Sequence, residues 1–157
     1  MTETVKATRL EAHDVLAQLW EIADTVPRPN GVTACVYARQ SDEKGKATPV
    51  CIVGQWLARQ ELDLYPLVEV RSLNTLRFSA LTGWEVRDRG EQDTAVAELV
   101  AKIDAMPLTR AARSVLATVQ VEQDNGVDWR TAVANVWCQH LGHMPRMAGL
   151  FGVKETT

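Results

Sequence analysis

The stretch from Leu108 to Trp137 constrains the fold more than any other part of the chain, because it predicts two helices joined by a very short turn. Thr109 can cap the first helix, and Asn125-Gly126 supplies the left-handed residue that commonly ends one. Asp128 can cap the second helix. That helix carries an apolar stripe formed by Trp129, Ala132, Val133, Val136 and Trp137. Helices joined this closely lie against each other, so the stretch predicts an αα-hairpin.

Polar side chains crowd the junction between these two predicted helices. They are Glu122, Gln123, Asp124, Asn125 and Asp128. A calcium-binding EF-hand loop does not fit, because Val121 and Ala132 would stand where ligand oxygens are required. The structural interpretation gives turn and capping roles to Gln123, Asp124, Asn125, Gly126 and Asp128. We favour it because such residues are common wherever two helices meet.

The N-terminal half predicts one long helix followed by a β-hairpin. Residues 8–26 have the helical period, and Thr8 and Glu11 have the spacing of a capping box. Residues 32–38 and 48–53 are rich in β-branched side chains and flank a polar loop. We therefore expect a two-stranded antiparallel hairpin in this part of the chain.

The middle of the chain predicts further helices. Residues 55–62 and 94–105 have the helical period, and residues 65–70 can form another helical turn. The stretch 71–90 is ambiguous, since its apolar spacing favours a helix while residues 75–78 and 84–86 would also suit short strands. We favour the helix there.

These elements together predict one α+β domain that is mostly helical. A chain of 157 residues that is 46% hydrophobic can bury a single core, and no second domain is expected within residues 1–157. In this fold the small β-hairpin packs on a helical layer that includes the C-terminal αα-hairpin. The ends, 1–7 and 144–157, show no helical period or cap and are expected to be flexible or loosely docked tails.

The charge and the cysteine content of the chain indicate which partners and which cellular compartment to expect. The net charge is −3 and basic residues form no stripe, so we expect no nucleic-acid partner. A helix-turn-helix would offer only Arg130 as a basic side chain on its second helix. No stretch approaches the ~20 apolar residues of a membrane helix, and the N-terminus has no export signal. Three cysteines fit a reducing compartment, so a cytoplasmic location is expected.

Cysteine and histidine side chains offer one candidate metal site. Cys138, His140 and His143 could surround a zinc ion with Cys35 or Cys51 as the fourth ligand. The set lacks the paired spacing of known zinc motifs, and buried free thiols are the common alternative. We therefore predict no metal and no cofactor, although the sequence leaves open whether these five side chains bind one.

Two short blocks resemble a family of small uncharacterised actinobacterial and actinophage proteins. The first block, C-x-V-G-x-x-L, is matched by Cys51, Val53, Gly54 and Leu57. The second, Q-D-x-G-x-x-W-x-x-A-V, is matched by Gln123, Asp124, Gly126, Trp129, Ala132 and Val133. The resemblance implies an intracellular protein of phage or prophage origin, and it implies no activity and no catalytic residue.

Five tryptophans are many for a domain of this size, and partly exposed tryptophan is enriched in protein-binding surfaces. The leading hypothesis is a non-enzymatic protein that binds a host factor or a second copy of itself. Trp137, Val133 and Trp84 are the candidate partner-binding residues. We expect Trp129 in the core and Trp137 partly exposed. The alternative is a small enzyme with its site between the β-hairpin and Glu122, Asp124 and Asp128.

Overall fold

The computed structural model describes residues 8–27, 37–68, 76–79, 83–86 and 94–142. The elements are α1 (Ala12–Thr25), β1 (Ala38–Gln40), β2 (Ala47–Pro49), α2 (Ile52–Arg59), the 3-10 helix η1 (Tyr65–Leu67), β3 (Leu76–Ser79), β4 (Gly83–Val86), α4 (Thr94–Asp104), α5 (Arg110–Asp124) and α6 (Trp129–Leu141). Strands β1 and β2 pair antiparallel, and so do β3 and β4. The prediction of a mostly helical α+β fold is confirmed. The expected tails, 1–7 and 144–157, lie outside the described residues.

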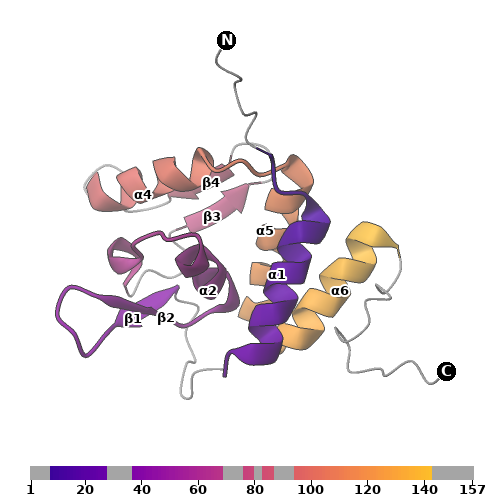
Figure 1. The fold of residues 1–157 in the computed structure, drawn as a ribbon, viewed down its shortest axis with the longest axis horizontal. Helices are drawn as coiled ribbons and strands as arrows, with labels where there is room; N and C mark the ends of the chain where they lie inside the picture. Colours follow the sequence, from indigo (N-terminus) through magenta and orange to yellow (C-terminus); the bar gives the residue numbers. More distant parts are fainter. Residues whose placement is uncertain (1–7, 28–36, 69–75, 80–82, 87–93, 143–157) are drawn as a thin grey trace, which may run out of the picture.

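Helix α1 lies at the centre of the helical layer and packs against α2, α5 and α6 (Figure 1). Helices α5 and α6 also pack against each other, which makes the αα-hairpin that the sequence predicts. The Thr109 hydroxyl accepts a hydrogen bond from the amide of Ala112 at 3.1 Å and caps α5. Asp128 accepts one from the amide of Thr131 at 3.1 Å and caps α6. The turn between them needs a glycine, because Gly126 has a φ of +88°.

Helix α1 begins at Ala12 rather than at residue 8, and its capping box is Glu11 with Asp14 rather than Thr8 with Glu11. The reason is a pairing with a distant part of the chain. The Leu10 amide donates to the Pro107 carbonyl at 2.7 Å, and Leu10 accepts from the Thr109 amide at 3.0 Å. Residue 10 is therefore held in an extended bridge, and the helix can start only after it.

The strands of the first β-hairpin are shorter than predicted, and the loop between them is shorter as well. Its register pairs Ala38 with Pro49 and Gln40 with Ala47. The prediction of a strand through residues 51–53 is wrong, because Cys51 caps α2 and the helix begins at Ile52. The predicted strand residues 32–36 lie outside the described part of the chain.

The favoured helix in residues 71–90 is also wrong where the structure describes this stretch. Strands β3 and β4 form an antiparallel hairpin that pairs Leu76 with Val86 and Ser79 with Gly83. Strand β3 lies against α5 and strand β4 lies against α4. Packing against these two helices selects the extended alternative that the local pattern had also allowed.

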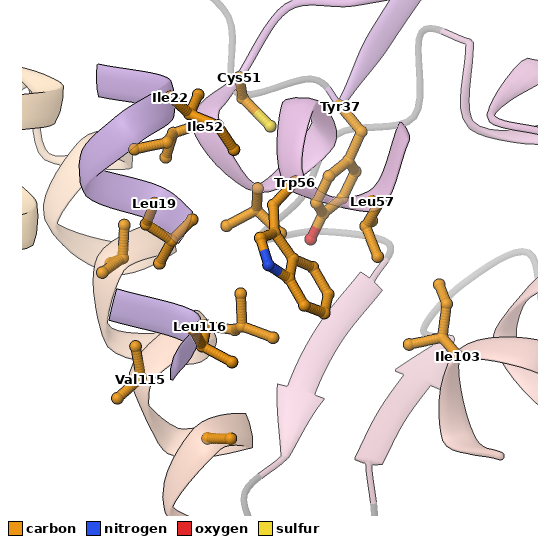
Figure 2. Packing of buried hydrophobic residues seen from close by; sticks show 14 of the residues in the cluster. Leu19, Ile22, Tyr37, Cys51, Ile52, Trp56, Leu57, Ile103, Val115 and Leu116 are labelled. Atoms are coloured by element: carbon orange, nitrogen blue, oxygen red, sulfur yellow. The ribbon is translucent and has the colours of Figure 1, made fainter. Parts of the chain in front are cut away.

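The core joins side chains from α1, α2, α4, α5 and α6. Figure 2 shows Trp56 at its centre, near Leu19 and Leu116 on one side and Leu57 on the other. The Trp56 indole is fully buried, and its Nε1 donates to the Gln18 side chain at 2.8 Å. Among the helices that the structure describes, none combines the length and apolar character needed to cross a bilayer.

Candidate functional site

The two sequence blocks meet where the start of α2 contacts the end of α5. The Ile52 amide donates to the Gln123 side-chain oxygen at 2.8 Å. The Cys51 thiol donates to the Gln120 side-chain oxygen at 3.8 Å, and the Gln120 amide group donates to Asp124 at 2.9 Å. We call these five residues the α2–α5 junction. Side chains from α5 thus bind both the first amide of α2 and its capping thiol.

Cys51 acts as the N-cap of α2, a role in which serine, threonine, aspartate and asparagine are more common. Its sulfur accepts a hydrogen bond from the Gly54 amide at 3.1 Å. Together with the bond to Gln123, this satisfies two of the amides that the first turn of a helix leaves without partners. Free thiols are found at Cys51, which is buried, and at Cys138, which is exposed.

Gly54 is required by a close approach of two backbone segments. A Cβ atom at this position would lie 2.3 Å from the Tyr37 carbonyl oxygen, and a real Cβ never comes so near. The same carbonyl accepts a hydrogen bond from the Val50 amide at 3.0 Å, so it cannot easily move away. The glycine of the first sequence block therefore has a packing role.

Burial favours the neutral form of Cys51 at the junction and of Tyr37 beside it. Burial raises the pKa of the Cys51 thiol to about 12, with a further contribution from the nearby Asp124 charge. Burial also raises the pKa of Tyr37 well above its usual value, and Cys51 and Asp124 act in the same direction. A thiol with this pKa is not a thiolate at neutral pH, so Cys51 is unsuited to nucleophilic chemistry.

Each of the three carboxylates proposed for an enzyme site accepts hydrogen bonds from a different partner. Asp124 holds Gln120, and Glu122 accepts a hydrogen bond from Asn135 of α6 at 3.4 Å. Asp128 caps α6, and its hydrogen bonds to the hydroxyl and amide of Thr131 lower its pKa. Each carboxylate therefore holds a structural contact, and Asn125 and Gly126 form the turn between the helices.

The candidate zinc ligands are only partly described. Cys138 and His140 lie on α6 and Cys51 caps α2, whereas Cys35 and His143 lie outside the described residues. Within the described part of the chain, no group of three histidine, cysteine or acidic side chains is arranged to hold a metal ion.

The expectation that Trp137 is partly exposed is wrong, and Val133, the other partner-binding candidate on α6, is buried as well. Trp137 is 2% exposed and Val133 is 0% exposed, so both lie in the core beside Trp129. Helix α6 packs against α1 as well as α5, and the apolar stripe is therefore covered from two sides. Trp84 pairs with Phe78 across β3 and β4, and its side chain is outside the described structure.

A pocket of about 980 Å³ opens at the connection between α4 and α5, a place to which no sequence motif pointed. It is lined by Thr8, Arg9, Asp104, Ala105, Met106, Pro107, Leu108 and Arg113. The lining contains two arginines and one aspartate, and the remaining side chains are mostly apolar. Its volume is within the range of small-ligand sites, which is about 300–1,000 Å³.

Arg113 is fixed at the wall of this pocket by the end of α4. Its Nη2 donates to the carbonyl oxygens of Asp104 at 2.8 Å and of Met106 at 3.3 Å. Its Nη1 is buried and has no hydrogen-bond acceptor among the residues that the structure describes. The bridge between Leu10 and Leu108 ties the segment that carries Arg9 to the same pocket. We call this site the Arg113 pocket.

Comparison with known proteins adds no relative to this picture. A scan against protein-family models finds no match to the chain, and searches of curated proteins and of solved structures find none either.

Proposed function

We propose that this chain is a small, cytoplasmic, non-enzymatic protein of phage origin that acts by binding another protein. The observation that carries the proposal is the open pocket at the α4–α5 connection, whose lining combines Arg9 and Arg113 with the apolar Met106, Pro107 and Leu108. Arginine and large apolar side chains are enriched in protein–protein interfaces. A hollow with this lining offers a partner both apolar contact and positive charge.

The α2–α5 junction supports the non-enzymatic part of the proposal. Its hydrogen bonds join two helices, and the raised pKa of Cys51 keeps the thiol protonated. The free thiols of Cys51 and Cys138 are typical of a reducing compartment, which supports a cytoplasmic protein. A host bacterial factor is the partner that the sequence resemblance favours, and a second copy of the chain is the alternative.

The test is capture of a partner by the tagged full-length chain from an actinobacterial lysate, followed by titration of the purified partner. We expect saturable binding with a fixed stoichiometry, and sedimentation of the chain alone will reveal any self-association. A tag-only bait is the control. The proposal fails if no protein is enriched above that control and the chain also sediments as a monomer at every concentration.

A further inference from the structure

We propose that the Arg113 pocket receives an aromatic side chain of the protein partner. This inference rests on the proposed function and specifies which chemical group the partner presents. It follows from three features of the lining: the accessible apolar surface of the α4–α5 connection, the sulfur of Met106 and the exposed Arg9. With a volume of about 980 Å³, the pocket has room for the ring of any aromatic residue.

The apolar wall of the pocket is a continuous stretch of the connection, residues 105–108. Ala105 and Pro107 are exposed and Met106 is half-buried, so all three offer apolar surface that a partner can reach. Aromatic side chains bury large apolar areas, and they are common anchors at the centre of protein interfaces. The Met106 thioether adds a preference for a ring, because sulfur makes favourable contacts with aromatic edges.

Arg9 supplies a second contact that favours a ring. It is exposed, and its side chain takes part in none of the ion pairs within the part of the chain that the structure describes. A guanidinium stacks on the face of an aromatic ring, whose quadrupole attracts the cation. The same molecule already contains such a contact, since the Arg130 guanidinium carbon lies 5.2 Å from the centre of the Trp20 ring.

The backbone that carries these two contacts is held together before a partner arrives. The Leu10 amide donates to the Pro107 carbonyl at 2.7 Å, and the Thr109 amide donates to the Leu10 carbonyl at 3.0 Å. The segment that carries Arg9 is therefore tied to the connection that carries Met106. Because less backbone freedom is lost on binding, more of the interaction appears as affinity.

The test uses the full-length chain and capped five-residue peptides in an NMR titration. The central residue is phenylalanine, cyclohexylalanine or alanine, and serine fills the other positions, so no peptide carries a net charge. Cyclohexylalanine keeps the size and apolar character of phenylalanine but has no aromatic ring. We expect the phenylalanine peptide to bind at least about tenfold more tightly than the alanine peptide. Only the phenylalanine peptide should move the methyl signal of Met106 by a ring-current shift, and Met106→Leu assigns that signal.

Two outcomes of this titration would overturn the proposal. One is equal binding of the phenylalanine and alanine peptides. The other is a phenylalanine peptide that binds while the Met106 methyl signal stays in place, because the ring would then lie outside the pocket.

Arg9→Gln tests the contact between the cation and the ring. The position is exposed, so the variant should fold like wild type. We expect it to lower the affinity of the phenylalanine peptide about threefold and to leave the affinity of the cyclohexylalanine peptide unchanged. Arg110→Gln removes the same charge at the exposed first residue of α5, outside the lining, and should change neither affinity. If Arg9→Gln weakens both peptides equally, Arg9 does not recognise the ring and the proposal is overturned.

Ala105→Gln tests the apolar wall, and Ala101→Gln is its matched control one turn earlier in the chain. Both alanines are exposed, but only Ala105 lines the pocket. We expect Ala105→Gln to weaken the phenylalanine peptide about fivefold, because a polar side chain replaces part of the apolar surface. Ala101→Gln should bind like wild type. Equal affinity of the two variants would place the binding site elsewhere and overturn the proposal.

Capture from the lysate separates this inference from the proposed function. If Ala105→Gln captures the partner with the same yield as wild type, the proposed function stands and this inference is rejected. If the phenylalanine peptide binds in the pocket but no partner is captured, the preference of the pocket stands and the proposed function is rejected.

Discussion

The α2–α5 junction and the Arg113 pocket both bring polar side chains to helix ends. They differ in whether each hydrogen-bond donor has an acceptor. At the junction, the Ile52 amide, the Cys51 thiol and the Gln120 amide group each have an acceptor. At the pocket, Arg113 has acceptors for Nη2 and none for Nη1 among the described residues. A satisfied group stabilises the fold, whereas an unsatisfied buried donor costs free energy.

The comparison is sharpest at Gly54, where we expect the largest effect on stability. Gly54→Ala places a Cβ 2.3 Å from the Tyr37 carbonyl oxygen, so backbone must move at the junction. We expect the free energy of unfolding to fall by about 3 kcal/mol or more. Urea denaturation followed by circular dichroism measures it.

Gly126→Ala is the matched control for that experiment. Gly126 has a φ of +88° and open space around its Cβ position, so the cost comes from backbone strain alone. We expect about 1 kcal/mol. If the two alanine variants lose equal stability, the close approach of α2 to Tyr37 does not constrain the fold.

The second prediction concerns alkaline pH. The pKa of Cys51 is about 12 in the folded protein and 9.0 for an ordinary thiol, so the folded state binds the proton more tightly. The resulting stability is fully present below pH 9 and is lost as pH rises through the window up to about 12. Between pH 9 and about pH 10.5 the loss should be about 2 kcal/mol.

Cys51→Ser isolates this contribution, because serine can cap α2 and does not ionise in this range. Titratable groups distant from Cys51 are shared by both proteins and cancel in the difference, whereas Tyr37, whose pKa Cys51 also raises, contributes to it. We expect the stability of wild type relative to Cys51→Ser to decline as pH rises through this window. A difference that stays constant from neutral pH to about pH 10.5 would show that the thiol is not buried as described.

The elements that follow from local rules could be predicted from the sequence. Thr109 and Asp128 cap their helices through amides three positions away, and Gly126 provides its positive φ within one turn. In each case the signal and the partner lie within a few residues. This local agreement explains why the αα-hairpin could be predicted correctly.

The elements that depend on distant partners could not be predicted. The acceptor that favours a helix start at Ile52 is Gln123, 71 positions away, and the β-branched residues near Cys51 indicated a strand instead. Trp137 is buried because α1 covers α6, which no pattern within α6 reveals. The Arg113 pocket joins residues near Arg9 to the α4–α5 connection, and it has no local motif.

The third prediction tests whether the junction is held by its hydrogen bonds. Gln123→Leu removes the acceptor of the Ile52 amide and leaves that donor without its partner at the start of α2. We expect a loss of about 1–2 kcal/mol in the free energy of unfolding. Gln139→Leu, at an exposed position on α6, controls for the change of residue type and should cost less than about 0.5 kcal/mol. Equal losses in the two variants would mean that Gln123 adds nothing to the fold.

The smallest effect on stability is expected for Arg113→Lys, and this variant separates the two regions most directly. Nη1 has no acceptor in the described structure, so removing it costs the free protein nothing at that atom. In Arg113→Lys the ammonium group can still donate to the carbonyl of Asp104 or Met106, and the loss of stability should stay below about 1 kcal/mol. Arg113→Leu leaves both carbonyls without this donor and should cost about 1–3 kcal/mol. Thermal melts of the two variants decide the matter. If lysine destabilises as much as leucine, the whole guanidinium serves the fold, and Arg113 then belongs to a second structural junction.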